Sequence, residues 1–237
     1  MRFDAASNPY ARAINTAAEA GVDERAAFIM RTYVHLAGAI FAFVALETAL
    51  FFTGIAQALV PYMLGRGSWG IVLIAFIGVS WLADRWARNT TSLPMQYAGL
   101  GTYVLAQAVI FLPLMAIALQ YDPNAIPTAA LVTLVLFGGL TGIVFLTKRD
   151  FSFMRGILGV LALASLGVIA CSLIFGFSLG VLFAGAMVAL AGGYILYNTS
   201  NVLHHYRTDQ HVSAALTLFA DVALMFWYVL RIFMSRR

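Results

Sequence analysis

The chain has 237 residues, of which 62% are hydrophobic and 10% are charged, and its formal net charge is +4. Soluble domains carry about 25% charged residues, so this chain has too few charges to cover a surface that faces water, and lipid must surround most of it. The basic residues are spread through short segments, which does not indicate binding to nucleic acid. The single cysteine, Cys171, excludes a disulfide within the chain.

The first part of the chain is polar and mixed in charge, and we expect residues 1–31 to form a cytoplasmic N-terminal tail. No apolar run typical of a cleaved signal peptide occurs there, so we expect none. Residues 17–29 fit either a short amphipathic helix on the membrane surface or an irregular tail.

The remainder, residues 32–237, is expected to form one transmembrane domain. A hydrocarbon core about 30 Å thick needs roughly 20 apolar residues in a helix. The predicted spans are residues 32–52, 70–82 with extensions toward 62 or 86, 97–119, 126–147, 153–175, 178–203 and 212–234. A sharp break is predicted at Gly176 and Phe177. The fold class that follows is an all-α membrane protein, a bundle of about seven transmembrane helices.

The positions of the basic residues predict the orientation, because cytoplasmic loops carry an excess of lysine and arginine. With the N-terminus in the cytoplasm, the basic residues inside are Arg2, Arg12, Arg25, Arg31, Arg85, Arg88, Lys148, Arg149, Arg155 and Arg207. Those outside are Arg66, Arg231, Arg236 and Arg237. A re-entrant or strongly tilted last helix is the alternative, because it would return the basic C-terminus to the cytoplasm.

Small residues recur at a spacing of four, which lets helices pack closely in lipid. They are Gly138 and Gly142, Gly176 and Gly180, and Gly185, Ala189 and Gly193. We expect these rows to serve packing within the bundle rather than a dimer interface.

Polar residues in the last two spans are the main functional candidates, because ionisable groups inside a membrane are costly and face the interior of a bundle. Asp221 lies in the middle of the last span, with Thr217 and Tyr228 on nearly the same face. The preceding span carries a polar stripe, formed by Tyr194, Tyr197, Asn198, Asn201 and His205. The depths of Asn198 and Asp221 agree within about 6 Å, so we expect the two stripes to face each other. The seam between them would hold water, a proton or a cation, or would be a clamp that only fixes the packing.

Two further ionisable residues, Glu47 and Arg231, lie toward the outer ends of the first and last spans. An ion pair between them would lower the cost of burying both. The alternative is that Arg231 extends to the membrane interface.

The histidines are expected to have structural roles. We predict an interfacial hydrogen bond for His35. His204, His205 and His211 share one loop, but no cysteine or paired carboxylate joins them at a spacing typical of a metal site, so we predict a solvated loop without a metal. No nucleotide-binding or hydrolase motif is present, so we expect neither enzyme activity nor a cofactor.

Short motifs in a fixed order resemble the Bax inhibitor-1 family across residues 31–233. The motifs in the last two spans are Tyr197-Asn198-Thr199-Ser200, Leu203-His204-His205-Tyr206, Ala214-Ala215-Leu216-Thr217-Leu218-Phe219-Ala220-Asp221 and Leu230-Arg231-Ile232. Supporting motifs are Arg31-Thr32-Tyr33, Lys148-Arg149-Asp150-Phe151-Ser152-Phe153, and Pro113 followed by Tyr121.

The resemblance implies a seven-helix bundle with the last helix at its centre and a calcium leak regulated by pH. In bacterial members of the family, two aspartates on helices six and seven share a proton and act as the pH sensor. Asp221 matches the second aspartate, whereas Asn198 stands in place of the first. Asparagine does not titrate, so pH gating would be lost or would pass to Asp221 alone, to Glu47 or to the histidine loop. The family's arginine at the inner end of helix two is matched by Arg88 or Arg85.

Two functions are therefore expected as alternatives. The first is a passive leak in which Ca²⁺ is the transported ion. The second is a non-conducting regulator that binds and restrains a membrane-bound protease or a cell-death or stress partner. The lipid bilayer is the expected surrounding, in the inner membrane of a bacterium or an internal membrane of a eukaryote.

Overall fold

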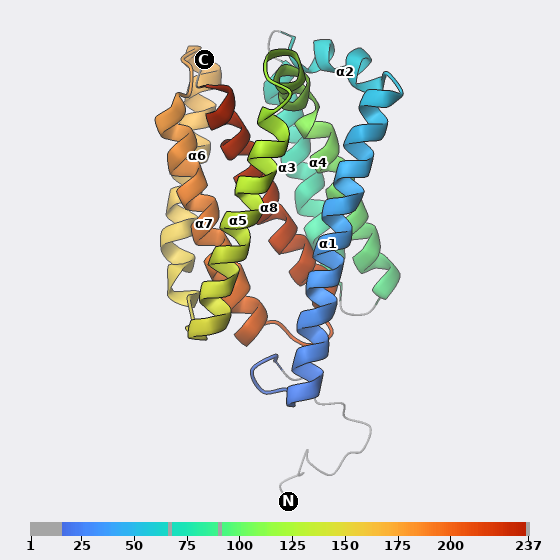
Figure 1. Ribbon diagram of the computed structural model, residues 1–237, viewed down its shortest axis with the longest axis vertical. Coiled ribbons are helices and arrows are strands. Elements are labelled where there is room, and N and C mark those ends of the chain that lie inside the picture. Colours follow the sequence, from blue (N-terminus) through green and yellow to red (C-terminus); the bar gives the residue numbers. More distant parts are fainter. Residues whose placement is uncertain (1–15, 66–67, 90–91, 236–237) are drawn as a thin grey trace, which may run out of the picture.

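The computed structural model describes residues 16–65, 68–89 and 92–235, and helices are the only extended secondary structure in these ranges (Figure 1). The helices are α1 (Val22–Phe52), α2 (Ile55–Met63), α3 (Ser68–Ala87), α4 (Leu93–Tyr121), α5 (Ala125–Thr147), α6 (Arg155–Phe175), α7 (Val181–His204) and α8 (His211–Met234). A short 3-10 turn, Ser152–Met154, leads into α6. Seven helices in these ranges are long and apolar enough to cross a membrane. The predicted fold class is therefore confirmed.

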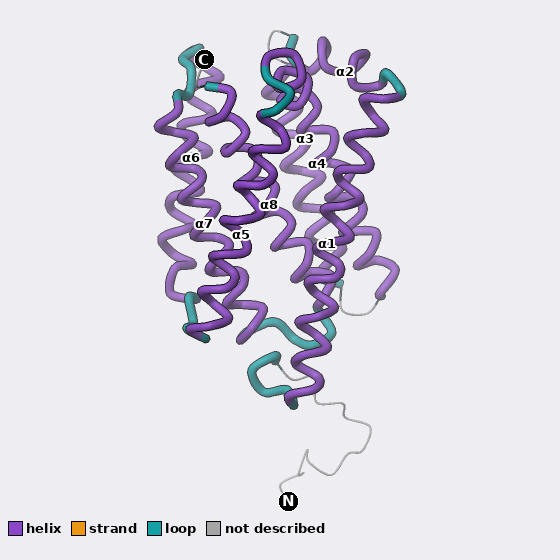
Figure 2. The backbone as a smooth tube through the Cα atoms, viewed as in Figure 1, coloured by secondary structure: helices purple, strands orange, loops and turns teal. Residues whose placement is uncertain are grey.

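The bundle has two ends, which the course of the chain distinguishes (Figure 2). We call the end where α1 begins the N-side; it carries loops 148–151 and 205–210. The opposite end, where α8 finishes and loop 176–180 lies, is the C-side. Residues 1–15 of the expected tail, with Arg2 and Arg12, lie outside the described residues, as do Arg66, Arg236 and Arg237.

The first span begins earlier than the hydrophobic run predicts. Helix α1 starts at Val22 and has 31 residues, which corresponds to about 46 Å. Asp23 and Glu24 occupy its first turn, where negative charge is favourable. Because the hydrocarbon core is about 30 Å thick, the first turns of α1 extend beyond it on the N-side.

Glycines in the left-handed conformation end two helices. Gly176 has φ 73° and ends α6, which confirms the predicted break between the fifth and sixth spans. Gly54 has φ 80° and separates α1 from the short helix α2, Ile55–Met63. Helix α2 was not predicted from the sequence, because residues 55–63 continue the hydrophobic character of the first span.

Helix α8 is the most enclosed span. It contacts α1, α3, α4, α5 and α7. In its most apolar stretch 78% of the residues are buried, compared with 6% in that of α6. Figure 1 shows α8 behind and between α1 and α5, with α6 at the margin of the bundle. The side chains of α8 therefore face protein, whereas those of α6 mostly face lipid.

Helices α3 and α4 approach each other closely at Gly99, a glycine outside the predicted rows of small residues. A Cβ atom on Gly99 would lie 2.5 Å from the Ala83 carbonyl oxygen and 2.5 Å from the Ala87 nitrogen. In contrast, a Cβ on Gly138 or Gly142 would have no atom within 4 Å. The spacing of small residues therefore did not locate this contact.

We predict that Gly99→Ala destabilises the bundle by about 1–3 kcal/mol, because backbone atoms of α3 would have to move to admit the methyl group. Gly101→Ala is the matched control in the same helix, where a Cβ meets nothing within 4 Å. Thermal unfolding of the purified protein in detergent, followed by circular dichroism, measures both. Equal midpoints for the two variants would contradict the prediction.

Candidate functional site

The polar stripes of the last two spans meet in the interior of the bundle. Helices α7 and α8 pack against each other, and Asn198 and Asp221 are 7% and 6% exposed. The Asn198 Nδ2 atom donates a hydrogen bond of 2.8 Å to Asp221 Oδ2. The prediction that the two stripes face each other is confirmed.

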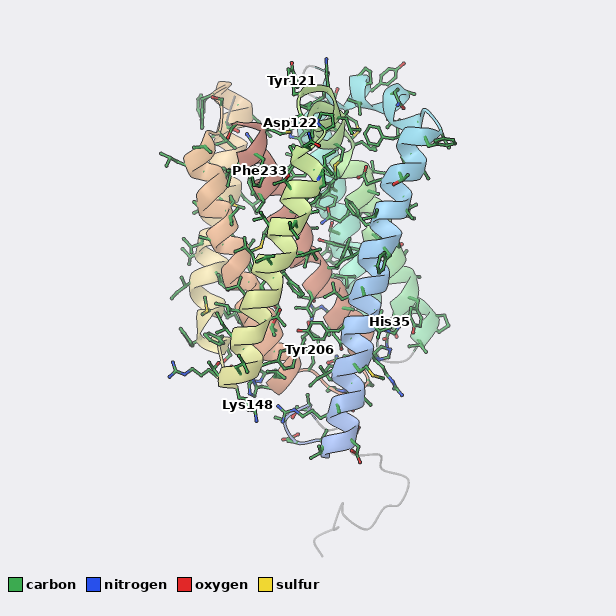
Figure 3. All side chains as sticks on the ribbon, viewed as in Figure 1. His35, Tyr121, Asp122, Lys148, Tyr206 and Phe233 are labelled. Carbon is green, nitrogen blue, oxygen red and sulfur yellow. The ribbon has the colours of Figure 1, made fainter. Side chains whose placement is uncertain are left out.

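A second polar contact lies one turn closer to the N-side. The Thr217 hydroxyl donates to the Ser213 carbonyl oxygen at 3.1 Å, so the Tyr206 hydroxyl is the donor in its 3.1 Å contact with Thr217 Oγ1. Burial raises the pKa of Tyr206, and the phenol therefore stays protonated as a donor. Figure 3 shows Tyr206 at the N-side of the bundle. Polar groups thus continue from Asp221 toward the N-side loop.

The arginine that joins this group is Arg88. Its Nε atom lies 2.7 Å and 2.9 Å from the two carboxylate oxygens of Asp84, and its guanidinium interacts with the Tyr206 side chain. The hydrogen bond with Asp84, and to a smaller extent Tyr206, raises the pKa of Arg88. Arg85 lies over the ring of Trp81 instead, 5.5 Å from its centroid. The geometry therefore places Arg88, and not Arg85, beside the α7–α8 loop.

The tyrosines of the predicted seam lie on the C-side of the Asn198–Asp221 pair and face α6. Tyr194 Oη donates to the Leu158 carbonyl oxygen at 3.2 Å. Tyr228 is buried in the same cluster, against which Tyr197 also packs. The three rings pack beside the Asn198–Asp221 pair. Among the described residues, none of them has a hydrogen bond to Asp221.

Asn201, another member of the stripe, lies in the last turn of α7. Its carbonyl oxygen accepts hydrogen bonds from the N–H groups of His205 and Tyr206, at 2.8 Å and 2.9 Å. Asn201 thereby shapes the loop that carries Tyr206, so its contribution to the site is indirect.

Helix α4 supplies a polar pair that the sequence analysis did not assign to the seam. Gln107 Nε2 lies 3.4 Å from Tyr103 Oη, and both residues are buried. Tyr103 is close enough to Asp221 to interact with it electrostatically, and its ring lies 6.1 Å from that of Phe219. In the sequence, this pair is indicated by the spacing of four residues between Tyr103 and Gln107, two polar side chains in an otherwise apolar span.

The predicted ion pair between Glu47 and Arg231 is wrong: no such pair occurs among the described residues. Arg231 Nη2 donates to the Leu179 carbonyl oxygen at 3.0 Å, which ties the end of α8 to loop 176–180. Glu47 is 7% exposed, and neither of its carboxylate oxygens has a hydrogen-bond partner. Glu47 faces a cavity bordered by Phe219 and Phe226 of α8. Arg231 projects from a different face of that helix, because successive residues turn by about 100°.

The predicted hydrogen bond of His35 is confirmed, and Figure 3 shows this side chain on the N-side half of α1. Its Nδ1 atom lies 2.7 Å from the Arg31 carbonyl oxygen, so Nδ1 carries the proton. Nε2 lies 2.9 Å from the Tyr97 hydroxyl and accepts its hydrogen bond when the imidazole is neutral. The His35 ring also lies 4.9 Å from that of His211.

The three histidines of the α7–α8 segment have different partners. His204 Nδ1 contacts the Ser200 carbonyl oxygen at 3.0 Å. His205 Nε2 lies 3.1 Å from Asp150 Oδ2, whereas His211 faces His35. Within the described ranges, no group of three or more histidine, cysteine or acidic side chains is arranged to hold a metal ion.

The loop between α5 and α6 is attached to the end of α7. The Phe151 N–H donates to Ser200 Oγ at 2.9 Å, and the Ser152 N–H donates to Asp150 Oδ1 at 2.8 Å. This backbone hydrogen bond, with smaller contributions from the Ser152 side chain and His205, lowers the pKa of Asp150. Asp150 therefore helps to hold the two N-side loops together as a carboxylate.

The N-terminal residues also pack on the α7–α8 loop. The Ala17 N–H donates to the Tyr206 carbonyl oxygen at 2.8 Å, and the Thr208 hydroxyl donates to Glu24 Oε1 at 2.7 Å. Tyr206 is thus held at its backbone by Ala17 and at its side chain by Thr217.

Comparison with known proteins gives a family match along most of the chain. Residues 25–237 match the model of a family described as inhibitor of apoptosis-promoting Bax1. An uncharacterized protein of Pseudomonas aeruginosa is 27% identical over 166 residues, which is 69% of this chain and 72% of that protein. Bax inhibitor 1 of Schizosaccharomyces pombe is 35% identical over 117 residues, 47% of this chain and 43% of that protein. Protein lifeguard 4 of Mus musculus is 26% identical over 121 residues, 51% of each chain. The chain therefore spans about half the length of the last two relatives.

We predict that Asp150→Asn destabilises the protein by less than about 1 kcal/mol at neutral pH, because the carboxylate is 45% exposed and screened by water. The pKa of Asp150 is lower in the folded protein, so its contribution is complete above the unfolded value of about 3.9. The contribution is lost as the pH falls through the folded value. Unfolding measured at several pH values should show wild type and variant converging in acid. A difference that persisted at the acid end would contradict this assignment.

Proposed function

Because this chain belongs to the Bax inhibitor-1 family, we propose that it is an integral membrane protein that lets calcium leak along the contact between α7 and α8. The hydrogen bond of 2.8 Å between Asn198 and Asp221 is the observation that carries the proposal. Ionisable groups are costly to bury within a membrane bundle and are therefore rare there. Those that occur mark ion pathways.

The path that we propose leads from Asp221 toward the N-side. Thr217 and Tyr206 follow Asp221 in that direction and are hydrogen-bonded to each other at 3.1 Å. Arg88 interacts with Tyr206 at the N-side. These groups supply oxygen atoms along the route, and the charge of Arg88 at its mouth would oppose the entry of a cation. Movement of Arg88 away from Tyr206 is therefore part of opening.

Aromatic rings from α4 and α8 fill the interior on the C-side of Asp221. Phe226 is stacked on Phe111 with 5.7 Å between the ring centroids, and Trp227 meets the same Phe111 ring edge-on at 4.9 Å. This packing supports a closed resting state. Conduction then requires α8 to shift relative to its neighbours, which fits a slow leak better than a permanently open pore.

The asparagine at position 198 determines how such a leak depends on pH. Two facing carboxyls can share one proton, and their charge then changes with pH. An amide has no titrating proton, so Asn198 and Asp221 do not form a shared-proton pair. We therefore propose a leak that lacks the pH switch of the paired aspartates.

The orientation and location that we propose place the N-side in the cytoplasm. Arg25 and Arg31 lie near the beginning of α1, and Lys148 and Arg149 lie in an N-side loop, as the excess of basic residues on the cytoplasmic side requires. In a bacterium the protein would then lie in the inner membrane, with the C-side toward the periplasm.

We predict that wild-type protein in proteoliposomes admits calcium at a rate that depends less on pH, between about pH 6 and pH 8, than the rate of the Asn198→Asp variant. Asp221→Asn should lower the rate at least about fivefold, because it removes the buried carboxylate. Asn198→Asp should make the rate depend on pH. A calcium-sensitive dye inside the vesicles measures all three. Asp23→Asn is the control, since it removes an exposed carboxylate at the start of α1. Wild-type flux unaffected by Asp221→Asn would overturn the proposed path.

A second candidate function is a non-conducting regulator that restrains a membrane-bound protease or a cell-death or stress partner. It is favoured by a small N-side hollow of about 220 Å³, lined by Arg25, Ile29, Phe145, Lys148 and Leu203. Two cations around an apolar floor would suit an acidic segment of a partner protein. Absence of calcium flux in both wild type and Asn198→Asp would favour this function.

For the regulator, we predict that Arg25→Glu combined with Lys148→Glu reduces co-purification of membrane-bound proteases at least about tenfold, because like charges would repel an acidic partner. Quantitative mass spectrometry of solubilised host membranes provides the measurement. Arg155→Glu reverses one positive charge at the start of α6, outside the hollow, and serves as the control for each of the two substitutions made singly. Unchanged protease recovery in the double variant would exclude the hollow as the docking site.

A further inference from the structure

A cavity of about 680 Å³ lies outside the α7–α8 seam, among α1, α4, α5 and α8. It opens sideways toward the lipid between α1 and α5, where its rim residues Phe41, Val44 and Leu134 are 75%, 53% and 51% exposed. Figure 1 shows α8 forming the back of this region. The cavity is therefore accessible from the membrane, and its ligand would enter from the lipid phase.

Two buried polar side chains line this largely apolar cavity, and a third polar side chain, Thr48, is exposed at its rim. Glu47 is 7% exposed, and both of its carboxylate oxygens lack a hydrogen-bond partner. Thr133, from α5, is 2% exposed, and its hydroxyl also lacks a partner. Buried polar groups in native proteins are nearly always hydrogen-bonded. Two unsatisfied groups in one cavity therefore indicate a ligand that supplies hydrogen-bond donors.

The surroundings of the Glu47 carboxyl define the ligand further. No lysine, arginine or histidine of the described ranges forms an ion pair with Glu47, so a cation that enters the cavity would be the counter-charge that lets this carboxyl ionise. A calcium ion prefers six to eight oxygen ligands, and the cavity offers one carboxylate amid apolar side chains. A primary ammonium group needs fewer partners, because it has three N–H donors.

The shape of the cavity defines the rest of the ligand. Glu47 is close to the C-side end of α1, and Thr133 lies in the C-side half of α5. From Glu47 the lining continues along α1 to Ala37, a distance of about 15 Å. The lining also continues from Glu47 to Phe51 on the C-side, so the polar groups lie in the C-side part of the apolar space. The longer part, toward Ala37, has room for a single alkyl chain.

We propose that this cavity binds a single-chain amphiphilic amine from the membrane. Its ammonium group donates hydrogen bonds to the Glu47 carboxylate and to Thr133 Oγ1, and its alkyl chain lies along α1 toward Ala37. A fatty acid would place a second carboxyl against Glu47, and a fatty alcohol would leave the carboxylate without a counter-charge. The site is distinct from the calcium path, so either is testable without the other.

The test uses the full chain in phosphatidylcholine nanodiscs, with radiolabelled dodecylamine as the probe and empty nanodiscs as the background. Wild type should show saturable binding with one site. Glu47→Gln, which keeps the shape of the side chain, should weaken that binding at least about tenfold because the charge pair is lost. Thr133→Val should weaken it by a smaller factor, because one neutral hydrogen bond is removed.

A second variant tests the position of the alkyl chain. Ala130 lines the cavity, so Ala130→Phe should also weaken binding at least about tenfold by filling the space. Ala164→Phe adds the same side chain to the exposed surface of α6 and should leave binding unchanged. Gel filtration confirms that each variant is folded.

Three results would overturn the proposal. One is the absence of saturable binding above that of empty nanodiscs. Another is dodecylamine binding that neither Glu47→Gln nor Ala130→Phe reduces. Competition by dodecanoic acid or dodecanol at the same concentrations as the amine would likewise reject the ammonium–Glu47 contact.

Discussion

An aspartate at the centre of a transmembrane helix costs about 3 kcal/mol on insertion into the membrane, and Asp221 lies in the middle of α8. Two features of the fold lower this cost. Helices α1, α3, α4, α5 and α7 pack around α8 and separate it from lipid, and the Asn198 amide lies 2.8 Å from the carboxylate. The other spans are buried to different extents, from 61% of the most apolar stretch of α4 to 11% of that of α3. Helix α6, at the margin of the bundle, is the least buried span: 6% of its most apolar stretch is buried, compared with 78% for α8.

The interior pair is connected to the N-side surface through few contacts. Tyr206 bonds to Thr217 in α8, interacts with Arg88 at the end of α3, and receives the Ala17 N–H at its carbonyl oxygen. The Asp150 carboxylate adds the α5–α6 loop through His205. A change at any of these loops therefore reaches α8 within one helical turn of Asp221. This connectivity is what a regulated leak or a partner-controlled protein requires.

The two buried carboxyls of the bundle have different surroundings. Asp221 has an internal hydrogen-bond partner on a neighbouring helix. Glu47 has none, and it faces a cavity that opens toward lipid. The difference arises because Arg231 bonds to the Leu179 carbonyl oxygen and leaves Glu47 without the expected counter-charge. One carboxyl thus belongs to the packed interior, and the other to a site that is accessible from the membrane.

The sequence by itself determined the class of fold, the spans and the facing of Asn198 toward Asp221. These follow from hydrophobic run length and helical periodicity, which are local properties that need no knowledge of the neighbouring helices. Only the tertiary structure decided between Arg85 and Arg88, separated Glu47 from Arg231, and brought Tyr103 and Tyr206 to the seam. Those outcomes depend on the rotation of each helix about its axis and on the course of the loops. Both are fixed by packing between segments distant in sequence, which no local pattern encodes.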